Sequence, residues 1–161
     1  MKKFSMALFV ILTVLFVSCG DNEQKEEIER SMEQLLWRLE RLEEITDNPR
    51  HAKEFIESQK WYVEELNNST KRLMKELNDI FDAEGESYSE KEVGEALGIV
   101  YTLTGESETL IENTGNHLDQ YQGEGTADIQ NELSMLLNES KKFKLELDRL
   151  KGQLNNLETA E

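Results

Sequence analysis

Apolar residues recur at alternating spacings of three and four along most of the chain after residue 22. The first such stripe is formed by Ile28, Met32, Leu35, Leu39 and Leu42. This spacing places apolar side chains on one face of an α-helix. The pattern predicts four helices, at about residues 23–46, 49–82, 89–121 and 127–158.

The other three helices have their own predicted inward faces. That of the second helix consists of Ala52, Phe55, Gln59, Tyr62, Leu66, Thr70, Leu73, Leu77 and Ile80. That of the third consists of Val93, Leu97, Val100, Thr104, Ser107, Ile111, Thr114, Leu118 and Tyr121. That of the fourth consists of Ile129, Leu133, Leu136, Ser140, Phe143, Leu147, Leu150, Leu154 and Leu157.

Local signals mark the helix boundaries. Asp47 and Asn48 precede Pro49, which predicts a tight turn followed by a helix whose first residue is the proline. A serine followed three residues later by glutamate, at Ser89 and Glu92, has the spacing of a capping box. Glycine-containing stretches at 83–87 and 123–126 separate the remaining helices, and Thr126 is the expected cap of the last one.

Short connections between long helices favour antiparallel neighbours. The predicted fold is therefore all-α, an elongated antiparallel up-down-up-down four-helix bundle with heptad packing. The alternative is a bundle of the three long helices with the first helix loosely attached. On length, residues 23–161 form a single domain.

The first eighteen residues have the composition of an export signal. Lys2 and Lys3 precede an apolar run of fourteen residues, Phe4 to Val17, broken only by Ser5 and Thr13. A membrane-spanning helix needs about 20 apolar residues, so this run is too short to span a bilayer comfortably. The pattern predicts a signal peptide at 1–18 that is cleaved from the mature chain.

The four residues Phe16-Val17-Ser18-Cys19 resemble the lipobox of bacterial lipoproteins, in which cleavage precedes a cysteine. This resemblance implies that the Cys19 thiol carries diacylglycerol and that residues 19–22 form a tether. Two or three acyl chains of the palmitate type anchor a protein stably in a membrane. Gly20, not aspartate, follows Cys19, which by the same resemblance favours the outer membrane or cell surface of the cell envelope over the inner membrane.

The net charge of the chain limits the classes of partner that it is expected to bind. The whole sequence carries 18 basic and 34 acidic residues, a net charge of −16, and loss of Lys2 and Lys3 with the signal makes it −18. Such a surface repels nucleic acid and anionic lipid, so a charged protein partner is expected to be basic. Cys19 is the only cysteine, which excludes an intrachain disulfide.

Two sets of polar residues are candidate ligand sites. The two histidines of the chain, His51 and His117, are expected at the same end of the bundle and are candidate metal ligands, although no known ligand spacing supports them. Thr104, Ser107 and Ser140 fall on apolar stripes and form a possible pocket at mid-bundle. More often such residues bond to a carbonyl of the preceding turn. No cofactor is expected.

Four further residues are candidate partner contacts: Trp37, Trp61, Gly98 and Gly105. The two tryptophans lie beside the apolar stripes and are expected mainly to close the flank of the bundle, with an exposed contact surface as the alternative. The third helix also contains Gly94 and Gly115, and its four glycines predict either close packing inside the bundle or a shallow surface that receives a partner.

No nucleophile beside a base and no phosphate-binding loop is recognisable, so the chain is not expected to be an enzyme. The sequence instead predicts a lipid-anchored envelope protein that presents an acidic helical bundle as an interaction, adaptor or structural module. The alternative is a sensor or carrier bundle for a small ligand or a metal. The two differ in whether the middle of the bundle is sealed or hollow.

Overall fold

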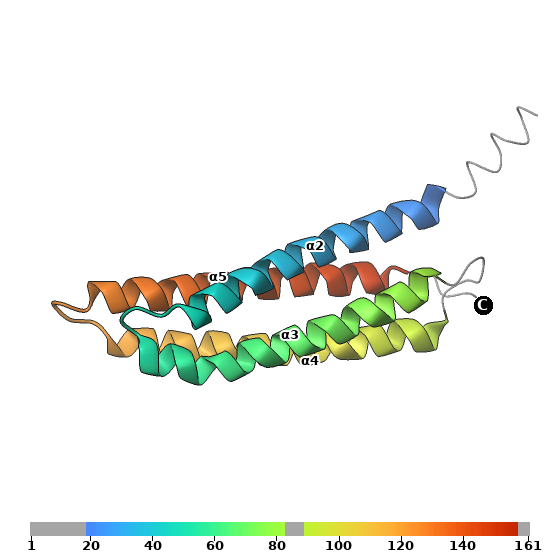
Figure 1. Cartoon of the computed structure of the whole chain (residues 1–161). Coiled ribbons are helices and arrows are strands. Elements are labelled where there is room, and N and C mark those ends of the chain that lie inside the picture. Colours follow the sequence, from blue (N-terminus) through green and yellow to red (C-terminus); the bar gives the residue numbers. More distant parts are fainter. Residues whose placement is uncertain (1–18, 83–88, 158–161) are drawn as a thin grey trace, which may run out of the picture.

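The computed structural model describes residues 19–82 and 89–157, which form four helices (Figure 1). These are α2 (Cys19–Asp47), α3 (Lys53–Asp82), α4 (Glu90–Gln120) and α5 (Ala127–Asn155). The predicted signal peptide and the turn at 83–87 lie outside the described residues. The fold is an all-α four-helix bundle, as the apolar pattern predicts.

Each helix packs against two neighbours in the cyclic order α2, α3, α4, α5, so that α2 and α4 lie across one diagonal. Contacts between side chains show that α2 and α5 are antiparallel. Ser31 of α2 donates a hydrogen bond to Gln153 of α5 at 2.6 Å, and Arg38 forms a 3.0 Å ion pair with Glu139. In Figure 1, α2 runs obliquely to the other helices and diverges from α3 and α4 toward its N-terminal end.

The core runs along the bundle and is formed by apolar side chains of all four helices. The predicted stripes of α2 and α5 are confirmed: every predicted residue is buried except Ile129, which is partly buried at the start of α5. No helix in the described part of the chain is both long enough and apolar enough to span a membrane.

The predicted inward face of α3 is buried except at two positions, whereas that of α4 is correct at about every second position. On α3, Ile56 and Val63 are buried, whereas Phe55 and Tyr62 are only partly buried. On α4, core positions are occupied by Ala96, Leu103 and Leu110 in place of the predicted Leu97, Thr104 and Ile111. A helix that contacts two neighbours buries a face wider than a single stripe, so the choice between adjacent apolar residues depends on how the helix is rotated.

The N-terminus of α4 is formed as predicted. The Ser89 hydroxyl accepts a hydrogen bond from the Glu92 backbone N–H at 3.3 Å, and the Glu92 carboxylate accepts one from the Ser89 N–H at 3.1 Å. These two bonds are the reciprocal pair of a capping box. The pKa of the Glu92 carboxyl is held below its ordinary value by the Ser89 hydroxyl, which donates to it at 2.8 Å, and by the Ser89 N–H.

Three other helix ends differ from the prediction. The segment 19–22, expected as a tether, is already part of α2. It contains no proline that would interrupt the helix. Thr126 stands at the N-cap position of α5 as predicted, but its hydroxyl makes no cap hydrogen bond to the helix and donates instead to the Gly123 carbonyl oxygen at 2.7 Å. The third difference, at the start of α3, belongs to the site described next.

Candidate functional site

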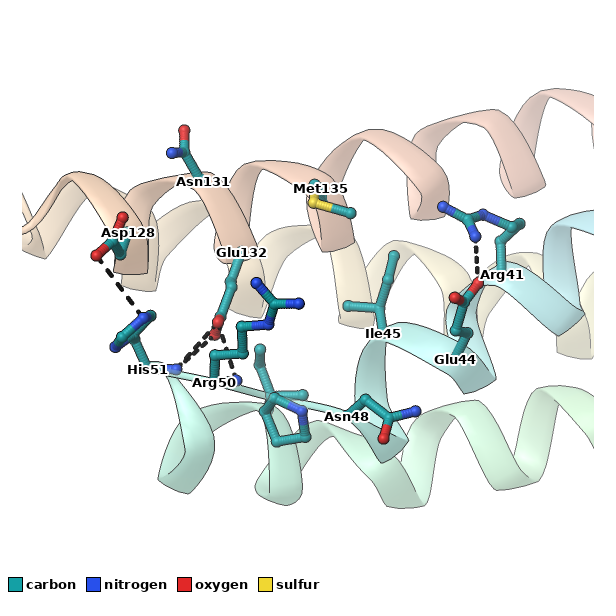
Figure 2. Close-up of a pocket in the computed structure, with 12 residues that line it drawn as sticks. Arg41, Glu44, Ile45, Asn48, Arg50, His51, Asp128, Asn131, Glu132 and Met135 are labelled. Carbon is teal, nitrogen blue, oxygen red and sulfur yellow. Dashed lines mark hydrogen bonds and ion pairs between the residues drawn. The ribbon is translucent and has the colours of Figure 1, made fainter.

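A hollow of about 440 Å³ lies at the end of the bundle where α2 meets α3 (Figure 2). We call it the distal hollow. Its walls come from the last turns of α2, the connecting segment 48–52 and the first turns of α5. Its lining includes Arg41, Ile45, Arg50, His51, Glu132 and Met135.

Glu132 of α5 holds the connecting segment in place. Its carboxylate accepts hydrogen bonds from the backbone N–H groups of three successive residues, Arg50, His51 and Ala52, at 2.9 to 3.1 Å. Three adjacent N–H groups directed at one anion form a concave binding site for it. The chain between α2 and α3 is thereby fixed by a residue that is some eighty positions distant in sequence.

This contact explains why the predicted start of α3 at Pro49 is wrong. The helix begins at Lys53, and residues 48–52 form bends between α2 and α3. The N–H groups that a helix beginning at Pro49 would leave to a local cap are satisfied by Glu132 instead. No local sequence pattern indicates this role of Glu132, because a capping residue on another helix has no fixed sequence spacing from the helix start that it caps.

Opposing effects set the pKa of Glu132. Burial by itself raises the pKa of this carboxyl, but the N–H groups of Ala52, His51 and Arg50 outweigh burial and hold the pKa below its ordinary value. Hydrogen bonds donated to a carboxylate favour its charged form. Glu132 is therefore a charged and hydrogen-bonded part of the wall of the distal hollow at neutral pH.

The two histidines lie in different surroundings. His51 Nε2 is 3.7 Å from an Asp128 carboxylate oxygen, and both side chains are exposed. The His117 ring stacks on Phe55 with ring centres 3.9 Å apart and also contacts Tyr121. Across the described ranges, no group of three or more histidine, cysteine, aspartate or glutamate side chains is placed to hold a metal ion.

The polar residues of the mid-bundle stripes bond to their own helices. The hydroxyl groups of Thr104, Ser107 and Ser140 donate to the carbonyl oxygens of Val100, Thr104 and Leu136 at 2.7 to 2.8 Å. None of the three residues lines the distal hollow or a second one, of about 350 Å³, between α2 and α3. Their geometry is that of hydroxyl groups bonded within a helix.

The two tryptophans do not close the flank of the bundle as expected. Trp37 on α2 is 48% exposed and Trp61 on α3 is 57% exposed. The Arg38 guanidinium lies 4.2 Å from the ring centre of Trp37, and Trp61 meets Tyr62 edge to face. Each indole points outward because the buried stripe of its helix occupies the opposite side.

The glycines of α4 are not sites of close helix approach. A Cβ atom built on Gly94, Gly98, Gly105 or Gly115 meets no other atom within 4 Å. Tyr101, which is exposed, lies between Gly98 and Gly105, and the Lys151 ammonium is 4.2 Å from the centre of its ring. The expectation of close packing inside the bundle is therefore wrong, since Gly94, Gly98 and Gly105 are exposed and Gly115 is half-buried.

The four candidate contact residues do not lie on one face. Gly98 and Gly105 share α4, whereas Trp37 is on α2, across the diagonal of the bundle. Trp61 is on α3, between these two helices. A flat partner that covers the glycines of α4 therefore does not reach Trp37.

No protein family model, curated protein or solved structure matches this chain.

Proposed function

We propose that the protein is anchored to the bacterial cell envelope by lipid on Cys19 and presents its acidic helical bundle to another protein. The anchor rests on the resemblance of Phe16-Val17-Ser18-Cys19 to a lipobox. The outer membrane or the cell surface is the proposed location. The partner is proposed to be basic, since the mature charge of −18 would steer a positively charged surface toward the bundle.

The exposed glycines of α4 are the observation that carries the interaction role. Glycine within a helix costs about 0.5–1 kcal/mol relative to alanine. In this bundle the cost has no compensation inside the fold, because added Cβ atoms at these positions would meet nothing. A surface without side chains lets the backbone of another helix approach closely, and this is the role that we propose for Gly98 and Gly105.

A carrier role for the middle of the bundle has less support. It would require Thr104, Ser107 and Ser140 to turn toward a shared cavity, but each hydroxyl bonds to its own helix. The proposal includes no bound cofactor and no catalytic reaction.

Removing the Cys19 thiol tests the anchor. Cys19→Ala cannot accept diacylglycerol through a thioether, so the expected products are an uncleaved precursor or a soluble chain. Expression in a bacterial host, followed by detergent-phase partitioning and mass spectrometry of the N-terminus, distinguishes them. A Cys19→Ala chain that still enters the detergent phase with the mobility of the mature form would contradict lipidation at this residue.

The glycine surface is tested by Gly98→Ala and Gly105→Ala, separately and together. Each substitution is expected to raise the free energy of unfolding by about 0.5–1 kcal/mol, since alanine is favoured in helices and meets no clash. Envelope proteins captured by the acylated wild-type chain should be captured less well by the double variant. Undiminished capture by the more stable variant would remove the glycines from the interface.

A control for the capture experiment is Gly152→Ala on α5. Gly152 is exposed, and a Cβ atom there also meets nothing within 4 Å. This variant should gain similar stability while capturing the same proteins as the wild type. An equal loss of capture in both variants would point to helix stability, not the α4 surface, as the cause.

A further inference from the structure

Arg50 is an exposed cation at the distal hollow, and its side chain has no partner among the residues that the structure describes. Figure 2 shows the Arg50 side chain directed from the connecting segment toward α5, between Glu132 and Ile45. In the ranges 19–82 and 89–157, no hydrogen bond or ion pair engages its guanidinium. Of the carboxylates that line the hollow, Glu44 pairs with Arg41 and Glu132 accepts from three backbone N–H groups, while Asp128 lies 3.7 Å from His51 Nε2.

The exposed guanidinium of Arg50 is therefore available to an anion that enters the hollow. A guanidinium has five N–H donors in a planar fork that matches a carboxylate, and it accepts no hydrogen bonds. The carboxylate of Glu132 is engaged by the backbone N–H groups of Arg50, His51 and Ala52. An anion that enters the hollow would therefore meet an available donor group that is already oriented toward α5.

The rest of the hollow is suited to an apolar body. Ile45 and Ile56 are buried and lie in its wall, and Met135 of α5 is 48% exposed beside them. A thioether side chain adapts to differently shaped apolar groups. The volume of about 440 Å³ is within the range of about 300–1,000 Å³ typical of small-molecule sites.

We propose that the distal hollow binds a small organic monocarboxylate. Its carboxylate accepts hydrogen bonds from the Arg50 guanidinium, and its apolar body lies against Ile45 and Met135. A single negative charge fits better than a phosphate dianion, because Glu44, Asp128 and Glu132 surround the hollow in a strongly acidic protein. The site is separate from the glycines of α4 and depends neither on the lipid anchor nor on a protein partner.

Binding is tested on the full-length purified protein with phenylacetate as the probe. Titration followed by heteronuclear NMR is expected to give saturable shift changes at Arg50, His51 and Asn131. Arg50→Gln should weaken binding about ten-fold or more, as for loss of a charged hydrogen-bonded contact. Arg149→Gln, which changes an exposed arginine on α5 outside the hollow, should leave binding unchanged.

Two ligand controls examine the two halves of the site. Phenylacetamide has the same ring without the negative charge and should bind about ten-fold more weakly. Inorganic phosphate has charge without an apolar body and should cause no saturable change at the same residues. Phosphate binding as strong as that of phenylacetate would contradict the apolar component of the site.

A matched pair of surface substitutions completes the test. Met135→Glu places a carboxylate where the ligand is expected and should abolish saturable binding. Leu145→Glu makes the same kind of change at an exposed apolar residue of α5 outside the hollow and should have no effect. Absence of saturable phenylacetate binding to the wild type, or equal affinity of the wild type and Arg50→Gln, would overturn the proposal.

Discussion

Replacing Leu136 or Leu147 by alanine is expected to lower the free energy of unfolding by about 2–5 kcal/mol at each site. Both residues lie on the inward face of α5 and are fully buried. Alanine leaves a cavity at each position, because the helices on either side relax only partly around the lost atoms. Urea unfolding followed by circular dichroism measures the loss.

Two other leucines of α5 are the matched controls. Leu145 is 68% exposed and Leu137 is only partly buried. The same substitution at these sites removes the same atoms but creates little or no cavity, so Leu145→Ala should have an effect within about 0.5 kcal/mol of zero. Equal losses at all four sites would show that the buried face of α5 is wrongly assigned.

Removal of the Glu132 carboxylate should cause the second large effect. Glu132→Ala leaves the N–H groups of Arg50, His51 and Ala52 without their acceptor. Hydrogen bonds to a charged group contribute about 1.5–3 kcal/mol, and we expect a loss in that range. Glu112 is exposed and has no partner within the described ranges, so Glu112→Ala is the control and should be nearly neutral.

The contribution of Glu132 should also depend on pH. Its pKa is lowered in the folded protein, so the stabilisation is fully present above its ordinary pKa of about 4.5 and is lost as pH falls through the lower folded-state value. Unfolding of the wild type and of Glu132→Gln should therefore differ by a constant amount above pH 4.5 and converge below it. A difference that persists throughout the acid range would mean that the charge is not what binds the connecting segment.

Hydrogen exchange can localise the same effect. The amide protons of Arg50, His51 and Ala52 donate to Glu132 in the wild type. In Glu132→Ala they should exchange faster than in the wild type, whereas amides in the middle of α4 should change only as far as global stability does. This pattern would separate loss of the local contact from general destabilisation of the bundle.

Much of the fold is determined by local and periodic features of the sequence. The four helices, the inward faces of α2 and α5 and the capping box of Ser89 and Glu92 all agree with the structure. Such features are predictable because a helix period and a three-residue cap spacing are properties of the backbone itself. The export signal and lipidation at Cys19 remain predictions, since residues 1–18 fall outside the described residues.

The candidate site depends on contacts between residues distant in sequence. The connecting segment 48–52 is held by Glu132 of α5, and the lining of the distal hollow includes Met135 from the same helix. The residues next to Gly98 in the sequence also do not determine its exposure, because exposure depends on where the adjacent helices pack.

The sequence by itself determined which side of each helix is apolar. Only the tertiary structure decided how each helix is rotated about its axis. The apolar residues determined that α3 and α4 each bury one side. The pattern did not decide between Phe55 and Ile56 on α3, or between Leu97 and Ala96 on α4, as the buried residue. Packing against two neighbouring helices buried Ile56 and Ala96. Adjacent residues on a helix differ by about 100° in direction, so a modest rotation exchanges a buried side chain for a half-exposed one. The distal hollow likewise depends on tertiary structure, because the bond from the Arg50 N–H to Glu132 brings the connecting segment against α5.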